Sequence, residues 1–429
     1  MLDIKLIREN PDLVKNNLEK RGNPENTKML EDLIAADLKW RQDLTKLNDI
    51  RHERKIVTTE IATLKKAGKD ATSQVAKAKQ LDTEITCIEK EVTEAEEKTR
   101  SYLMRLPNLL HETVPVGKDD SGNIQTRTWG TIPTFNYPVK NHIDLSLNLD
   151  IIDMERAGKV AGSRFFYLKK EAALLDVALI SFALHEITKK DYTPIIPPYL
   201  MRRAAYKGVT ALGDFEDVLY KIENEDLYLI ATSEHPMAAM YQNEVLKQDD
   251  LPIKLAGAST CFRKEAGAHG KDTRGIFRTH QFSKIEQFIF CAPEQSWQLH
   301  EELIQNAEAL LQKLEIPYRV VNVCTGDIGT VAAKKYDIEA WMPAQNAYRE
   351  VVSCSNCTDY QARRLNIRYR EKEGASTKGF VHTLNSTAIA TGRTIVAIIE
   401  NNQQEDGSIA VPKVLRKYMN DIEKITLKR

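Results

Sequence analysis

Charged side chains gather in one stretch of this chain of 429 residues, between Cys261 and Phe290. The stretch is typical of a strand, a glycine-containing loop and a second strand, with Arg263 and Glu265 on the first arm and Arg278 and Glu286 on the second. The planar fork of arginine matches phosphate and carboxylate oxygens. Two arginines and two glutamates on neighbouring strands therefore suit a polyanion with a cationic head, such as a nucleotide triphosphate beside an amino acid. An ordinary hairpin with solvated charges is the alternative.

The same stretch resembles motif 2 of the class II aminoacyl-tRNA synthetases, and more closely its form in the seryl-tRNA synthetase family. The segments that carry this resemblance are FRKEAG at 262–267, DTRG at 272–275 and HQFSKIE at 280–286. The resemblance implies an α+β fold, in which an antiparallel β-sheet flanked by helices carries the ATP. The sequence has no P-loop and no G-x-G-x-x-G between a strand and a helix, which disfavours the two commonest nucleotide sites.

Composition sets broad limits on the class of protein. Hydrophobic residues make up 42% and charged residues 28%, and the 61 Lys and Arg balance 61 Asp and Glu, so a basic surface for nucleic acid must be local. No apolar run approaches the roughly 20 residues of a membrane span. The segment MLDIKLIREN lacks the apolar core of a signal peptide, and six scattered cysteines do not make a disulfide framework. We therefore expect a cytoplasmic protein without a membrane partner.

Two long helical patterns follow a short helix at residues 1–22, which Asn10-Pro11 interrupts and Gly22-Asn23-Pro24 closes. Apolar residues recur every three or four positions over 31–66 and again over 71–106, with a break at Gly68 and an end at Pro107. Two such seams joined by a turn predict an antiparallel coiled-coil hairpin. Helices of about 36 residues would reach about 54 Å.

The charges of this hairpin are uneven. Residues 39–66 hold eight Lys or Arg against four acids, whereas residues 71–105 hold six against seven. A basic edge would suit a phosphate backbone, and a solvated helix face is the alternative. Seryl-tRNA synthetases have such an arm, which holds the long variable arm of the tRNA. The resemblance thus implies tRNA contacts for Lys39, Arg41, Arg51 and Lys55.

Glycine and proline divide the chain. The segment 107–135 is rich in both, so we predict an N-terminal tRNA-binding domain at 1–106, a linker at 107–135 and a class II catalytic domain at 136–429. A helix at 171–188 followed by TPIIPPYLM at 193–201 resembles motif 1, which lies at the class II dimer interface, and this implies a homodimer.

Thr232-Ser233-Glu234 follows the strand-like LYLIAT segment. Thr232 and Glu234, two apart on an extended segment, would point to the same side and could meet an ammonium and a hydroxyl together. An ordinary helix cap is the alternative. In the family, Thr-x-Glu at this place binds serine.

The segment REVVSCSNC at 349–357 contains Glu350 and Ser353, whose counterparts in the family contact ATP and its magnesium. A carboxylate and a hydroxyl are suitable hard ligands for Mg²⁺. Cys354 and Cys357 form a lone CxxC, which lacks the second pair that a structural zinc site usually needs.

Residues 382–419 resemble motif 3. Leu384–Ala390 is expected to be a strand, and Gly392-Arg393 to open a helix whose N-terminus suits phosphate. The family pattern at Asn385-Ser386-Thr387 makes Thr387 the serine contact. Ser386 stands where many members have Gly, which leaves open which hydroxyl points inward.

The resemblance covers nearly the whole chain and implies a serine–tRNA ligase. It would use ATP and Mg²⁺ to activate L-serine and would charge tRNA(Ser), with tRNA(Sec) left open as a second acceptor. The implied catalytic residues are Arg263 and Arg393. The implied serine contacts are Thr232, Ser233, Glu234, Arg263, Glu286 and Thr387. The implied ATP contacts are Arg263, Lys264, Glu265, Thr279, His280, Gln281, Phe282, Glu350, Val351, Val352, Ser353 and Arg393, of which Glu350 and Ser353 also take the metal.

Two alternatives are a non-catalytic protein of another functional class and a related enzyme. A synthetase-like protein that had lost catalysis and served as a binding or regulatory module would lack Arg263, Glu265 or Arg393, and this sequence has all three. A relative that charges a carrier protein would lack the long arm.

Overall fold

The computed structural model describes residues 1–210, 216–265 and 274–427. The chain divides into two compact units, Met1–Leu109 and Leu110–Arg429. None of the helices in these described ranges is long and apolar enough to cross a membrane.

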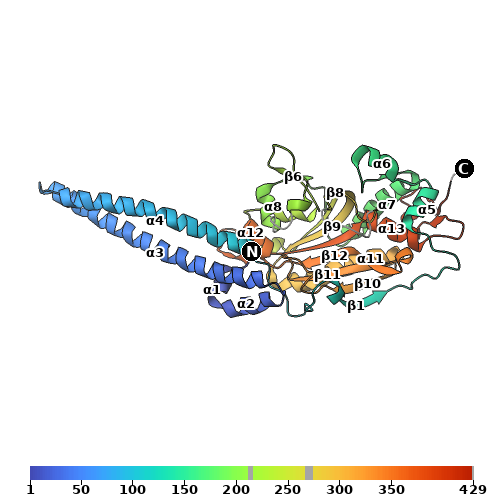
Figure 1. The fold of residues 1–429 in the computed structure, drawn as a ribbon, viewed down its shortest axis with the longest axis horizontal. Helices are drawn as coiled ribbons and strands as arrows, with labels where there is room; N and C mark the ends of the chain where they lie inside the picture. Colours follow the sequence, from blue (N-terminus) through green and yellow to red (C-terminus); the bar gives the residue numbers. More distant parts are fainter. Residues whose placement is uncertain (211–215, 266–273, 428–429) are drawn as a thin grey trace. The chain divides into compact units, whose positions relative to one another are not determined.

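The first unit is entirely helical (Figure 1). Its helices are α1 (Ile4–Glu9), α2 (Pro11–Glu19), α3 (Pro24–Lys66) and α4 (Thr72–Arg105). The predicted hairpin is present, and its first helix begins seven residues earlier than the expected Glu31. Asn23 accepts a hydrogen bond from the backbone N–H of Glu25, and Pro24 occupies the first turn, where no N–H is required. The Gly22-Asn23-Pro24 segment therefore both ends α2 and starts α3.

An apolar seam joins α3 to α4. Its buried members are Leu47, Ile50 and Val57 from α3, and Ala78, Leu81, Ile88 and Val92 from α4. Gly68, with a φ of 65°, turns the chain between the helices, because glycine adopts a positive φ without a steric penalty. Leu106 is extended, as expected of a residue before proline, and α4 ends there.

The second unit is built on a sheet of eight strands, in the order β1-β10-β11-β12-β15-β9-β8-β4. All neighbours in this sheet are antiparallel except β4 and β8. The strands are β1 (Ile124–Trp129), β4 (Thr193–Ile195), β8 (Ile253–Phe262), β9 (Gln281–Cys291), β10 (Tyr318–Asn322), β11 (Lys334–Met342), β12 (Ala347–Asn356) and β15 (His382–Ala390).

Smaller elements complete this unit. Its short strands are β2 (Ile152–Asp153), β3 (Tyr167–Leu168), β5 (Leu200–Arg202), β6 (Leu227–Leu229), β7 (Val245–Lys247), β13 (Arg368–Arg370), β14 (Thr377–Phe380), β16 (Ile409–Ala410) and β17 (Lys424–Ile425). Its helices are α5 (His142–Asn148), α6 (Met154–Ala161), α7 (Lys170–Thr188), α8 (Arg203–Val209), α10 (Glu234–Ala239), α11 (Ser296–Lys313), α12 (Tyr360–Leu365), α13 (Thr391–Asn401) and α14 (Lys413–Arg416).

Two hydrophobic cores cover the sheet. The larger one packs α7, α11 and α13 against odd-numbered residues of β9, including Ile285 and Ile289. The smaller one packs α8, α10 and α12 against Phe288 and Phe290. Because successive side chains of a strand point to opposite faces, β9 is buried on both sides. The polar residues Lys284 and Glu286 share a face with Phe288, and they lie where the smaller core ends.

Part of the segment 107–135, which was predicted to be a linker, belongs to the large sheet. Its residues Ile124–Trp129 form β1, which pairs with β10 at the edge of the large sheet. The unit boundary also falls at Leu109, slightly later than the expected residue 106. Most of the expected linker therefore belongs to the second unit.

Two details of the predicted hairpin need correction. Arg263 and Glu265 lie just beyond the end of β8 rather than on it, and Glu265 has a φ of 49°. The second strand begins at Gln281, not at Arg278. The backbone N–H of Arg263 still donates to the carbonyl of His280 at 2.9 Å, so the two arms stay paired at this point. The loop glycines Gly267 and Gly270 lie outside the described residues.

Candidate active site

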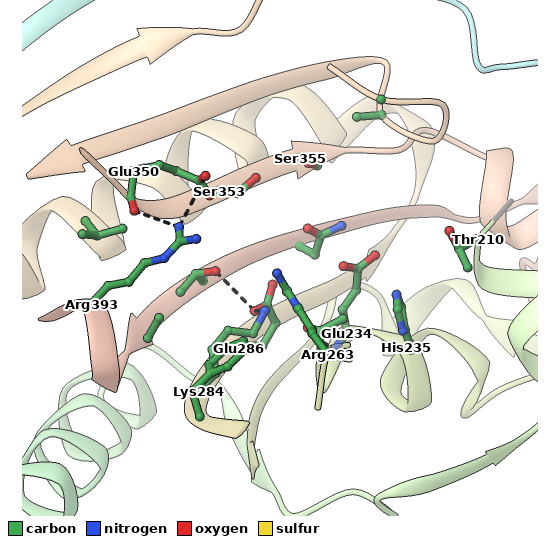
Figure 2. A pocket seen from close by; sticks show the side chains of 18 of the residues that line it. Thr210, Glu234, His235, Arg263, Lys284, Glu286, Glu350, Ser353, Ser355 and Arg393 are labelled. Carbon is green, nitrogen blue, oxygen red and sulfur yellow. Dashed lines mark hydrogen bonds and ion pairs between the residues drawn. The ribbon is translucent and has the colours of Figure 1, made fainter. Parts of the chain in front are cut away.

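A cavity of about 410 Å³ lies in the second unit, over the face of the sheet that carries Glu286 (Figure 2). Strands β9, β12 and β15 form its floor, and α8, α10, the residues after β8 and the segment 328–332 contribute to its walls. Figure 2 shows Arg393, Glu350 and Ser353 at one end of this cavity, and Glu234 and His235 at the other.

Strand geometry decides which side chains reach the cavity. Lys284 and Glu286 of β9, Ser353 and Ser355 of β12, and Asn385 and Thr387 of β15 are spaced by two residues and line it. Their neighbours Ile285, Cys354 and Leu384 lie in the core on the opposite face. This alternation follows from the period of two of a β-strand.

Arg263 is fixed at the edge of the cavity by several contacts. Its Nε donates to the carbonyl of Ala231 at 3.2 Å, and its guanidinium carbon lies 5.2 Å from the ring centre of Phe282. His280 supports the same backbone, because its Nδ1 lies 2.8 Å from the carbonyl oxygen of Arg263. A guanidinium held this firmly loses little further entropy when it binds an anion.

The Thr232-Ser233-Glu234 segment is not extended as predicted. Ser233 has helical angles, and Glu234 begins α10, with its backbone N–H donating to Thr232 Oγ1 at 3.2 Å. The capping contact and the cavity position therefore coexist, since Thr232 and Glu234 both line the cavity. Ser233 is buried elsewhere and donates to the carbonyl of Gly257 at 3.2 Å.

Glu286 is the most enclosed carboxylate of the cavity floor, with a side chain 2% exposed. It forms an ion pair with Lys284 on the same strand. Thr387, which lies directly opposite on β15, approaches Glu286 Oε2 with its hydroxyl at 3.5 Å. Ser386 turns its hydroxyl to the carbonyl of Thr387, so Thr387 is the member of this pair that lines the cavity.

Glu350 and Ser353 reach the same cavity although they are three residues apart. On a regular strand they would face opposite sides, but the pairing of β11 with β12 shifts between Ile338 and Glu339, so that Val351 is an extra residue. This bulge restores the shared side. Arg393, in the first turn of α13, donates to the carbonyl of Glu350 at 2.8 Å and lies 3.4 Å from its carboxylate.

An aromatic ring supports the cations at this end. The ring centre of Phe277 lies 5.0 Å from the guanidinium carbon of Arg393 and 4.6 Å from that of Arg349. Cations over an aromatic face are attracted by the ring quadrupole. Phe277 therefore helps to orient Arg393 beside Glu350.

The carboxyl groups of the two ends differ in acidity. Burial raises the pKa of Glu234 to about 7, and the charge of Glu286 adds to this effect. Burial also raises the pKa of Glu286. Burial acts in the same direction on Glu350, but the charges of Arg393 and Lys335 outweigh it and lower the pKa of Glu350. The cavity thus holds an ionised carboxylate beside Arg393, and two carboxyl groups near Arg263 that gain from a cationic ligand.

Most of the predicted site residues come together in this cavity. Those that line it are Thr232, Glu234, Arg263, Glu265, Thr279, Phe282, Glu286, Glu350, Val351, Ser353, Thr387 and Arg393. Five others do not line it: Ser233, Lys264, His280, Gln281 and Val352. Val352 faces the core on the other side of β12, and Lys264 lies over the ring of Tyr220 at 6.0 Å.

The sequence reasoning missed several lining residues. Lys284 could have been found, because it stands two residues before Glu286 on the same strand face. Asn385 is the first residue of the motif 3 triplet and lies two positions before Thr387. The segment 328–332 carries no recognisable signal, since the tertiary fold alone brings it to the cavity.

The residues at the Arg393 end fit a hard divalent cation. Glu350 keeps 46% of its side chain exposed, and Ser353 adds a hydroxyl oxygen on the same side. Mg²⁺ is usually held by one or two protein oxygens together with substrate phosphates. Within the described ranges no group of three His, Cys, Asp or Glu side chains could hold a metal by itself. Cys354 and Cys357 are both buried, and neither forms a disulfide bond.

The four arm residues predicted to contact tRNA all lie on α3, and Lys55 is exposed. Lys39 pairs with Asp43 at 2.9 Å, Arg41 with Asp37 at 3.0 Å, and Arg51 with Glu89 at 2.7 Å. Their side chains remain 49% to 62% exposed. The Arg51–Glu89 pair is exposed on both sides and contributes roughly 0–1 kcal/mol, so a phosphate can replace Glu89 at little cost, whereas Asp37 is 3% exposed and is also held by Arg8.

Comparisons with known proteins agree with this geometry. The family model of the seryl-tRNA synthetase N-terminal domain matches residues 1–110, and that of the tRNA synthetase class II core domain (G, H, P, S and T) matches residues 218–402. The serine–tRNA ligase of Methanospirillum hungatei is 57% identical over 423 residues, which cover 99% of this chain and 100% of the relative. The chain belongs to the seryl-tRNA synthetases.

Solved seryl-tRNA synthetase structures have the same fold. The enzyme of Pyrococcus horikoshii, complexed with ATP, superposes with a TM-score of 0.96 at 52% identity over the full length of both chains. The cytoplasmic enzyme of Naegleria fowleri, in complex with AMP, gives 0.90 at 37% identity, covering 100% of this chain and 99% of that one. The predicted family and the predicted class II fold with its helical arm are confirmed.

Proposed function

We propose that the cavity is the site where this chain joins serine to ATP. As a seryl-tRNA synthetase the chain is a serine–tRNA ligase. The observation that carries the assignment is the division of one cavity into two parts. Arg263 and Arg393 offer cations to phosphates, while Glu234, Glu286 and Thr387 offer oxygens to an ammonium and a hydroxyl.

The reaction needs positioned charges more than acids or bases. A serine carboxylate oxygen attacks the α-phosphorus of ATP, the bond to the β-phosphate oxygen breaks, and diphosphate leaves. A ribose hydroxyl of the tRNA end then attacks the seryl carbonyl, and AMP leaves. Arg263 bridges the carboxylate and the α-phosphate, and Arg393 neutralises the outer phosphates. Glu350 and Ser353 would hold Mg²⁺, which supplies further charge on the phosphates.

The adenosine end is assigned to the hairpin residues. Thr279, Phe282 and Glu265 line the cavity beside Arg263, and the Pyrococcus horikoshii relative was solved with ATP. The ring of Phe282 offers an apolar face for a base, while Glu265 and Thr279 offer hydrogen-bonding groups.

Selection of serine is assigned to the opposite part. Glu286, Thr387 and Thr232 would read the hydroxyl and the ammonium of serine. A site built to hydrogen-bond a hydroxyl rejects an analogue that lacks it by a factor on the order of 10⁴. Alanine is therefore excluded without an editing domain, and threonine must be excluded sterically, by its additional methyl group.

The partners follow from the same assignment. The arm takes tRNA(Ser), and tRNA(Sec) is the second acceptor to be tested. A homodimer is supported by exposed apolar side chains on α7 and near the edge strand β4, namely Leu174, Val177, Ile196, Tyr199 and Leu200. We assign the protein to the cytoplasm, where its tRNA substrate is found.

ATP–diphosphate exchange by the purified full chain tests this function. Serine should start the exchange, and alanine and threonine should support it at least about 10³-fold less well. Charging of tRNA(Ser) and tRNA(Sec) transcripts in the same preparation then identifies the acceptors. Absence of serine-dependent exchange from folded protein would reject the proposed function.

A further inference from the structure

A buried amide lies directly behind one wall of the cavity. Gln361, near the start of α12, is fully buried and makes three hydrogen bonds to three different elements. Its Nε2 donates to Glu234 Oε1 at 3.1 Å and to the carbonyl of Val209 at 3.2 Å, and its Oε1 accepts from Thr383 Oγ1 at 2.7 Å. Both N–H groups of the amide are thereby used, and its orientation is fixed by its partners.

The partner of chemical interest is Glu234. Several ionisable groups lie around it: Glu286 and Lys284 from β9, Arg263 just beyond β8, Tyr206 from α8 and Cys357 after β12. Its neighbour His235 is uncharged, because burial lowers the pKa of His235 to about 3. Burial and the charge of Glu286 raise the pKa of Glu234 to about 7, while Lys284, the hydrogen bond from Gln361 and Arg263 act in the opposite direction. The ionised carboxylate is therefore costly to keep, and Gln361 is its fixed hydrogen-bond donor.

We propose that Gln361 is a positioning residue that keeps Glu234 ionised and directed at the ammonium group of the amino-acid substrate. The inference rests on the proposed serine site. The arrangement suits this role, because Gln361 donates to one oxygen of Glu234 from outside the cavity, while Glu234 itself lines it. The same amide fixes the carbonyl of Val209 at the end of α8, next to Thr210 in the cavity wall.

A purely structural role for Gln361 makes a different prediction. Loss of its hydrogen bonds would then lower stability and affect all substrates alike. Gln287 provides a matched control, because it is also fully buried and accepts from Asn306 at 2.9 Å and donates to the carbonyl of Leu303 at 3.3 Å. Gln287 points to the core on the opposite face of β9, away from the cavity.

The test compares Gln361→Met with Gln287→Met in the full chain, by ATP–diphosphate exchange from about pH 5.5 to about pH 9. In the unchanged protein, kcat/KM for serine should fall as the pH drops through about 7, because Glu234 takes up a proton. Gln361→Met should lower kcat/KM for serine about tenfold and move this acidic limb to higher pH, with KM for ATP within about twofold. Gln287→Met should change neither value.

The proposal is overturned if the two variants have the same kcat/KM for serine and the same fall of kcat/KM at low pH. If Gln361→Met does not fold, the isosteric Gln361→Glu decides. It places a second carboxyl group against Glu234, and the two then titrate as a pair, so the acidic limb must change position, and an unmoved limb overturns the proposal. Failure of the unchanged protein to exchange with serine would instead reject the proposed function, so the two failures are distinguishable.

Discussion

Glu286→Gln is the sharpest test of the proposed recognition of serine by the cavity. The substitution keeps the size of the side chain but removes its charge, at a position that is 2% exposed and paired with Lys284, itself 8% exposed. A hydrogen bond to a charged group contributes about 1.5–3 kcal/mol. If this hydrogen bond is lost in the transition state, kcat/KM for serine should fall roughly 10- to 150-fold. The KM for ATP should stay within about twofold, because Glu350 and Arg393 lie at the other end of the cavity.

The same substitution should also lower stability. Removal of one partner from a buried ion pair costs about 3–5 kcal/mol, and the retained amide should bring the loss to the lower end of this range. Urea unfolding measures it. Glu302→Gln is the matched control. Glu302 of α11 forms an ion pair at 2.7 Å with Lys254 of β8, the strand next to β9, but its side chain is 34% exposed and does not line the cavity.

ATP–diphosphate exchange at varied serine and varied ATP decides the result. Glu302→Gln should leave both substrates unchanged and cost less than about 1 kcal/mol of stability. A Glu286→Gln enzyme whose serine kcat/KM stays within about twofold of the unchanged protein would refute the assignment of Glu286. An equal loss for serine and ATP would show that the substitution disturbs the whole cavity.

Two further predictions concern other parts of the chain. Arg263→Ala should lower exchange by at least about 10²-fold with an unchanged circular dichroism spectrum, and a near-normal rate would remove Arg263 from the mechanism. Replacing Lys39, Arg41, Arg51 and Lys55 with Gln should remove the four proposed phosphate contacts of the arm. Exchange should persist, while charging of tRNA and the salt dependence of its binding should fall; undiminished charging would make the arm a spacer.

Local signals in the sequence were sufficient for the arm. Its helices were predicted because apolar residues recur with the helical period, and the buried seam of Leu47, Ile50, Val57, Leu81 and Ile88 confirms the pattern. The sequence pattern predicts the start of α3 too late, because it interprets Pro24 only as the end of the preceding helix. A proline in the first turn serves both purposes.

Tertiary pairing decided the elements with weak local signals. The segment Ile124–Trp129 has no apolar face and was predicted to be a linker, yet β10 offers it a sheet edge. Its burial pattern is almost wholly exposed, so backbone hydrogen bonds rather than side-chain burial make it a strand. No periodicity in the sequence could indicate this.

The chemistry of the site was visible in the sequence because residue type and order carry it. Arg263, Glu286, Glu350, Thr387 and Arg393 were all predicted, and all line one cavity. The sequence did not show which of several neighbouring residues face the cavity, because this depends on the faces of the strands and the ends of the helices. Ser233 and Val352 were predicted to be in the site, but their side chains point away from the cavity.

Only the tertiary structure decided how the two ends of the cavity are supported. The bulge at Val351 turns Glu350 and Ser353 to the same side, and the register of β11 against β12 creates it. Gln361 reaches Glu234 across 127 positions of sequence, because α12 packs beside α8 and α10. A sequence determines which groups are present, but register and packing between distant segments determine which groups meet, since those interactions depend on distance in space.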